Sequence, residues 1–91
     1  MAICVYFPVE GMTADKYDQV IDRLEAAGAG APPGRSYHVA FQMGDGLQVV
    51  DVWESQEALD KFGETLGPIL GGLGIGPGEA SAGEVHNIIV G

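Results

Sequence analysis

Three residues that together could carry out acid–base chemistry, His38, Asp51 and Trp53, stand on either side of one predicted turn. A carboxylate beside a histidine orients the imidazole and stabilises its charged form, so that the histidine can act as a general base. In an enzyme, we expect His38 to be the base, Asp51 its orienting partner and Trp53 a wall that stacks on a flat substrate. The alternative is a hydrogen-bonded polar cluster at a subunit interface.

A predicted β-hairpin brings these three residues together. The dipeptide Asp45-Gly46 is one of the strongest short-range signals for a two-residue hairpin loop. A loop at this position places His38 beside Trp53, with Asp51 diagonal to it and within reach on the same face of the sheet.

Side chains alternate along a strand, so the hairpin has one wholly apolar face, which we expect beneath the helices. Its residues are Val39, Phe41, Met43, Val50 and Val52. The other face carries the three candidate site residues, and Cys4 and Tyr6 of the first strand are predicted to join them. No further helix is predicted to cover that face, so the matching sheet of a second copy is the simplest cover. We therefore predict a homodimer, which also adds burial to a chain of 91 residues.

The whole chain, residues 1–91, is predicted to form one domain of the α+β class. Hydrophobic periodicity and turn residues give the element order β-α-β-β-α-β. Strands are predicted over residues 2–8, 36–43, 47–54 and 84–90, and helices from Thr13 to near Gly28 and from Ser55 to near Leu73. Right-handed crossovers place both helices on one face of a four-stranded antiparallel sheet, which is the ferredoxin-like arrangement.

The last predicted strand adds two polar residues to the search for a site. The candidate substrate-binding residues are Trp53, Tyr6, His86 and Asn87. A metal site built from His38, His86 and Asp51 has no supporting spacing motif, and we predict no metal.

The charge of the chain excludes some partners. Thirteen acidic residues against four basic ones give a net charge of −9. A negative field repels phosphate backbones and anionic lipids, so we expect binding neither to nucleic acid nor to membranes. The N-terminal stretch lacks the pattern of a signal peptide and there is a single cysteine, so we expect a cytoplasmic protein.

Three passages, "VVDVWESQEALDKF", "LGPIL" and "VHNII", resemble the dimeric α/β-barrel superfamily, which includes antibiotic-biosynthesis monooxygenase-like and stress-responsive domains. The resemblance implies a homodimer whose sheets pack face to face, with a small-molecule pocket in each subunit. It also implies cofactor-free oxygenation, haem breakdown, isomerisation or simple binding as possible activities. Haem-degrading members use an Asn, a Trp and a helix-borne His. This chain has no histidine in its predicted helices and no Asn in its first strand, so we expect no haem and no other cofactor.

These observations predict a small homodimeric domain that binds a small, partly aromatic molecule or converts it without a cofactor. The alternative is a non-catalytic binding or interaction module in which His38, Asp51 and Trp53 serve the dimer interface. A solvent-connected cavity that touches His38 or Trp53 would favour the first prediction, and a closed, dry interface the second.

Overall fold

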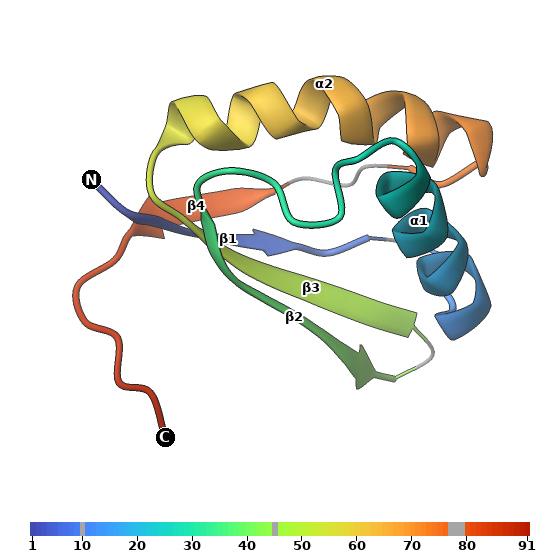
Figure 1. The fold of residues 1–91 in the computed structure, drawn as a ribbon. Helices are drawn as coiled ribbons and strands as arrows, with labels where there is room; N and C mark the ends of the chain where they lie inside the picture. Colours follow the sequence, from blue (N-terminus) through green and yellow to red (C-terminus); the bar gives the residue numbers. More distant parts are fainter. Residues whose placement is uncertain (10, 45, 77–79) are drawn as a thin grey trace.

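The computed structural model describes the chain except for residues 10, 45 and 77–79. The elements are β1 (Ile3–Phe7), α1 (Ala14–Ala26), β2 (Arg35–Met43), β3 (Gly46–Trp53), α2 (Gln56–Gly72) and β4 (Ser81–Glu84). The four strands form one sheet in the order β2-β3-β1-β4, and each neighbouring pair is antiparallel. Both helices pack on the same face of this sheet (Figure 1). The predicted ferredoxin-like β-α-β-β-α-β fold is thus confirmed.

Each helix begins at the capping residue that the sequence indicates. The Thr13 side chain accepts a hydrogen bond from the backbone nitrogen of Lys16 at 3.2 Å and so caps α1. Ser55 caps α2 in the same way, accepting from the backbone nitrogen of Ala58 at 3.1 Å. Neither described helix is long and apolar enough to cross a membrane.

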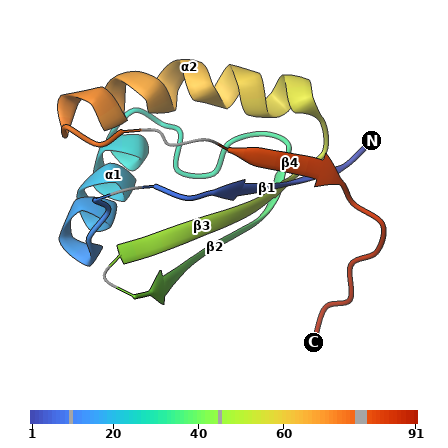
Figure 2. The same ribbon diagram turned by 180° about the vertical axis from the view of Figure 1, so that it is seen from behind.

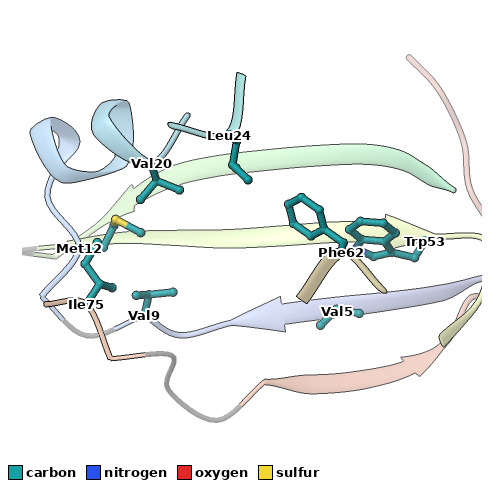
Figure 3. Close-up of a cluster of buried hydrophobic side chains, with 8 residues drawn as sticks. All are labelled: Val5, Val9, Met12, Val20, Leu24, Trp53, Phe62 and Ile75. Carbon is teal, nitrogen blue, oxygen red and sulfur yellow. The ribbon is translucent and has the colours of Figure 1, made fainter. Parts of the chain in front are cut away.

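The core lies between the two helices and the sheet (Figure 3). Its buried side chains are Val5, Val9, Met12, Val20, Leu24, Trp53, Phe62 and Ile75. Val5 and Trp53 are fully buried, and the Trp53 ring lies 5.2 Å from the ring of Phe62, measured between centroids. An aromatic pair at this separation adds to the stabilisation that its buried area already gives. The Trp53 end of β3 is therefore fixed against α2.

The hairpin is present, but its register differs by two residues from the prediction. His38 pairs with Asp51 and not with Trp53. A shift of two residues is one full repeat of a strand, so the side chains are still divided between the two faces as predicted. The shift brings His38 and Asp51 directly opposite each other.

The different register has its cause in the loop. Gly46 is the first residue of β3 and pairs with Met43, so it does not belong to the turn as predicted. Gly44 adopts φ +62°, a conformation that glycine enters easily and that a tight hairpin loop requires. Asp45, the other residue of the predicted turn, lies outside the described residues. The loop thus begins one residue earlier than its Asp-Gly signal suggests.

The predicted orientation of the hairpin is wrong. Val49, Asp51 and Trp53 are buried beneath the helices, whereas Val39 and Met43 are 53% and 58% exposed on the other side. Both faces carry enough apolar residues to form a core, so counting them does not decide between the two. The tryptophan decides, because its large side chain gains most from full burial.

The first strand has the predicted orientation, with Cys4 and Tyr6 on the side of the sheet that the helices leave uncovered. Because the hairpin is oriented the other way, these two residues do not share a face with His38 and Asp51. Val5 pairs with Asp51 and lies under the helices, whereas Tyr6 pairs with Val50 and is 37% exposed. Cys4 is likewise exposed. We call the side of the sheet away from the helices the open face. Its exposed large residues are Tyr6, Tyr37, Val39 and Met43.

The last strand comes earlier than predicted. β4 covers Ser81–Glu84 rather than residues 84–90. It pairs with β1 so that Glu84 lies opposite Ile3, and one more hydrogen bond joins the Val85 nitrogen to the Ala2 oxygen at 3.0 Å. The β1–β4 pairing ends here. Residues 85–91 instead run away from α2, as both ribbon views show (Figure 1, Figure 2).

Candidate active site

Asp51 lies in the middle of β3 and is 3% exposed. Its Oδ1 lies 2.5 Å from His38 Nδ1, and its Oδ2 accepts a hydrogen bond from Trp53 Nε1 at 3.3 Å. A buried carboxylate is tolerated only when its oxygens are hydrogen-bonded or paired with charge. Both oxygens of Asp51 have a partner, which explains how an aspartate can occupy the core side of the sheet.

His38 links this buried carboxylate to α1. Its Nε2 lies 2.7 Å from the Tyr17 hydroxyl, and the rings of His38 and Tyr17 stack with centroids 5.9 Å apart. With Nδ1–H donating to Asp51, the neutral imidazole presents Nε2 as an acceptor for the Tyr17 O–H. Trp53, Asp51, His38 and Tyr17 thus form one continuous chain of hydrogen bonds, which we call the polar chain.

Tyr17 keeps its hydroxyl proton within the polar chain. Burial raises the pKa of Tyr17 above its ordinary value of 10.0, and the negative charges of Asp51 and Asp18 raise it further, while Arg35 lowers it. The phenol is therefore neutral at physiological pH and acts as a hydrogen-bond donor.

A cavity of about 60 Å³ lies between the helices and the sheet and reaches the polar chain. Its lining residues are Phe7, Val9, Val20, Ile21, Leu24, Arg35, His38, Val49, Asp51, Phe62 and Leu66. The walls are thus almost entirely apolar, and the three polar groups are a base, a carboxylate and a guanidinium. Apolar walls with a few convergent polar groups are typical of small-molecule sites, although such sites commonly measure roughly 300–1,000 Å³. The cavity therefore accepts a small group or part of a larger ligand.

His38 is the more accessible member of the pair. Its side chain is 21% exposed, whereas that of Asp51 is 5% exposed. Both line the cavity, so the imidazole stands between the buried carboxylate and the part of its surroundings that solvent reaches. A base that is accessible and a carboxylate that orients it are the arrangement that general-base catalysis needs.

Arg35 reaches the cavity because β2 is irregular at its start. Arg35 pairs with Trp53 and Tyr37 pairs with Val52, although Trp53 and Val52 are adjacent in β3. Ser36 is therefore an extra residue with no partner in β3. Such a bulge redirects the side chains that precede it. Regular alternation would place Arg35 on the open face, and the bulge instead turns it toward the helices.

The remaining predicted site residues lie elsewhere. Tyr6 is on the open face, where its hydroxyl donates to Gln48 Oε1 at 2.5 Å. His86 and Asn87 are exposed in the segment after β4 and line a shallow hollow of about 430 Å³ with Cys4. The prediction that these three residues join His38 and Asp51 in one substrate-binding site is wrong.

The structure also separates the residues of the metal alternative. His38 and Asp51 line the cavity beneath the helices, and His86 lines the hollow that Cys4 and Val52 border. Within the described part of the chain, no group of three or more His, Cys, Asp or Glu residues is arranged to hold a metal ion.

Sequence reasoning missed Tyr17 and Arg35 as site residues. A signal for Tyr17 did exist, because a tyrosine within the apolar stripe of a helix usually needs a partner for its hydroxyl. His38 is such a partner once the correct face of the hairpin packs under α1. No comparable signal exists for Arg35, since its orientation depends on a bulge that the alternation pattern does not reveal.

Comparison with solved structures defines the class of this fold. The chain has the ferredoxin-like fold of antibiotic-biosynthesis monooxygenase-like proteins. This agrees with the family that its sequence resembles. No protein-family model and no curated protein sequence matches the chain.

Three neighbours illustrate the likeness. A candidate antibiotic biosynthesis monooxygenase from Chloroflexus aurantiacus J-10-fl aligns with 19% identity over 100% of both chains at a TM-score of 0.66. SnoaB, a cofactor-independent oxygenase from Streptomyces nogalater, aligns with 19% identity over 97% of this chain and 94% of its own at a TM-score of 0.63. NE2512, a protein of unknown function from Nitrosomonas europaea, aligns with 16% identity over 99% of this chain and 92% of its own at a TM-score of 0.65. At these identities the likeness establishes the fold alone.

Proposed function

We propose that this protein binds a small, partly aromatic molecule beside His38 and converts it without a cofactor. The observation that carries the proposal is the His38–Asp51 pair on the wall of an otherwise apolar cavity. An apolar pocket with an oriented base suits a flat substrate that carries an acidic proton. A cofactor-independent oxygenase among the structural neighbours supports the proposal that the conversion needs no cofactor.

In the proposed reaction, His38 Nε2 takes a proton from a hydroxyl group of the substrate. Asp51 stabilises the imidazolium that forms, because its carboxylate already accepts from Nδ1. The deprotonated, electron-rich ring then supplies electrons to dioxygen, which is the co-substrate. The O–O bond breaks, one oxygen atom is inserted at a ring carbon and the other leaves as water with two hydrogens from the substrate, while the ring is oxidised to a quinone. The Tyr17 hydroxyl occupies Nε2 in the structure, so the substrate must first replace it there.

A non-catalytic binding module is the second candidate function. The contact between Tyr17 and His38 favours it, because it leaves the base without a free lone pair while the cavity is empty. In this case the protein binds its ligand but does not convert it. The dimer-interface role that the sequence offered for Asp51 and Trp53 is wrong, since both are buried beneath the helices of their own chain.

We further propose that the open face is covered by a second copy of this chain. Large apolar and aromatic side chains are exposed there in the single chain, and such surfaces commonly mark protein contacts. The two sheets would then pack face to face, with both cavities on the outer sides of the assembly. Each subunit would carry a complete cavity of its own.

The two histidines of the chain provide a matched test of the catalytic proposal. With 1,5-dihydroxynaphthalene as the probe, we expect oxygen uptake by the wild-type protein. We expect His38→Gln to lower kcat/KM by about 10²–10⁴-fold, the usual contribution of a general base. His86→Gln, which changes the exposed histidine, should leave turnover unchanged. Asp51→Asn should also lower kcat/KM, because the imidazolium that forms on His38 loses its negatively charged partner.

Each contrary result has a definite meaning. Oxygen uptake that survives His38→Gln contradicts the role of His38 as base. Binding of the probe to wild-type protein without any turnover supports the binding module instead. Equal effects of the two histidine substitutions would show that neither acts through the cavity.

A further inference from the structure

Arg35 carries the only guanidinium or ammonium group among the described residues that line the cavity. The chain has four basic residues and a net charge of −9, so its overall field disfavours negatively charged ligands. One guanidinium at an apolar wall changes this locally, because charge interactions are stronger where water is largely excluded. The cavity thus carries a cation in a protein that has few of them.

The local backbone holds Arg35 in this place. Gly34 precedes it with φ +89°, and a Cβ atom built on Gly34 would lie only 2.7 Å from Ala58 Cβ on α2. Glycine is therefore needed for the loop to approach α2 so closely. The bulge at Ser36 then turns Arg35 toward the helices. Two independent backbone features thus aim the same side chain at the cavity.

The guanidinium retains unused hydrogen-bonding capacity. Its Nη2 donates to the Gly30 oxygen at 3.1 Å, and its central carbon lies 6.0 Å from the centre of the Phe62 ring. Among the described residues, no carboxylate lies within 4.0 Å of it, although Glu54 packs nearby against Gly34. An arginine has five N–H donors in a planar fork that fits a carboxylate in a bidentate manner.

We infer that Arg35 binds an anionic group of the ligand, and that the substrate is an aromatic acid. The inference rests on the proposed function, because it concerns a ligand of the same cavity. The acidic group meets the guanidinium fork at the cavity wall, and the ring lies against the apolar side chains. Phe62, which already stacks near the guanidinium, provides a surface for the ring.

Benzoate and benzamide provide a direct test, because they have nearly the same shape and differ in charge. Dissociation constants are measured from the NMR shifts of the His38 ring and of the Trp53 indole N–H. We expect benzoate to bind the wild-type protein about tenfold more tightly, the usual effect of a charge-assisted hydrogen bond. Arg35→Gln should remove this preference by lowering the affinity for benzoate to about that for benzamide. Benzamide binding then also shows that the variant is folded.

Arg23→Gln is the matched control, since it removes the same group from the exposed side of α1. It should retain the preference for benzoate. Arg35→Lys should retain part of it, because a lysine keeps the charge but loses the fork.

The possible failures are distinguishable. If both probes shift the His38 signals with equal affinity, the inference about Arg35 is overturned and the proposed binding function stands. If Arg35→Gln and Arg23→Gln weaken benzoate equally, the preference reflects net charge and the inference is again overturned. If neither probe shifts the His38 or Trp53 signals, both the inference and the proposed site are overturned.

Discussion

The two faces of the sheet use the same strands for opposite purposes. On the covered face, Asp51 and Trp53 are buried, and the buried polar atoms of the described residues have hydrogen-bond partners. On the open face, Tyr37, Val39 and Met43 are between 42% and 58% exposed and mostly apolar. The face with the more polar residues is thus the buried one. Polarity alone does not determine which face of a strand points inward, because a hydrogen-bonded polar group can be buried and an apolar face can await a partner.

The first way to break this comparison is to remove the anchor of the covered face. We expect Trp53→Ala to lower the free energy of unfolding by about 3–5 kcal/mol, because it leaves a large cavity against Phe62 and removes a donor to Asp51. Chemical denaturation measures the change. Tyr37→Ala removes an aromatic side chain from the open face and should lower the free energy of unfolding of the monomer by less than about 1 kcal/mol. Equal losses would contradict the assignment of the faces.

The second test addresses the open face itself. Val39→Glu places a carboxylate in the middle of the proposed contact between two copies, and burying such an unpaired charge costs about 3–5 kcal/mol. The dissociation constant of the dimer should therefore rise by about 100-fold or more, measured by analytical ultracentrifugation. Gln19→Glu adds the same charge to the exposed side of α1 and should leave the dimer intact. A wild-type chain that is monomeric at micromolar concentration contradicts the proposed dimer.

The smallest expected effect on stability comes from removing the Tyr17 hydroxyl at the end of the polar chain, compared with removing the Tyr37 hydroxyl on the open face. Tyr17→Phe removes only the hydroxyl that meets His38 Nε2, and we expect the free energy of unfolding to fall by about 0.5–1.5 kcal/mol. Thermal and denaturant unfolding at neutral pH measure it. Tyr37→Phe, on the open face, is the control and should change stability by less than about 0.5 kcal/mol.

Comparison of the wild-type protein with Tyr17→Phe also tests how the free energy of unfolding depends on pH. Because burial raises the pKa of Tyr17 in the folded protein, the folded state holds this proton more tightly than the unfolded state. The resulting contribution to stability is fully present below the ordinary pKa of 10.0 and is lost as the pH rises through the raised value. As the pH rises above 10.0, wild-type protein should therefore lose stability more steeply than Tyr17→Phe does. Parallel curves would show that the Tyr17 hydroxyl is not buried as described.

The sequence predicted the fold because the signals for its elements are local. Thr13 and Ser55 mark the helix starts, and the apolar periodicity of each helix is strong. The grouping of His38 with Asp51 was also predictable, because alternation along a hairpin survives a register error of two residues. What failed depends on long-range packing: the face that the helices cover, and the end of β4, which is set by where β1 begins.

The site was predicted in part for the same reason. His38 and Asp51 came from one hairpin, so short-range rules could pair them. Tyr17 comes from α1 and meets His38 only after the sheet has taken its correct orientation. Tyr6 was included because the hairpin was predicted with the wrong face toward the helices, and His86 because the last strand was predicted in the wrong range. Each error concerns the relation between elements and none concerns the type of an element.

The bulge at Ser36 makes β2 unusually tolerant of losing one residue. A single-residue deletion normally turns every side chain on one side of it to the opposite face of the sheet. Here the strand already contains a residue without a partner. Deletion of Ser36 would leave Tyr37 adjacent to Arg35 and restore regular alternation with both residues facing as they do now. The orientation of Arg35 is therefore compatible with two lengths of β2.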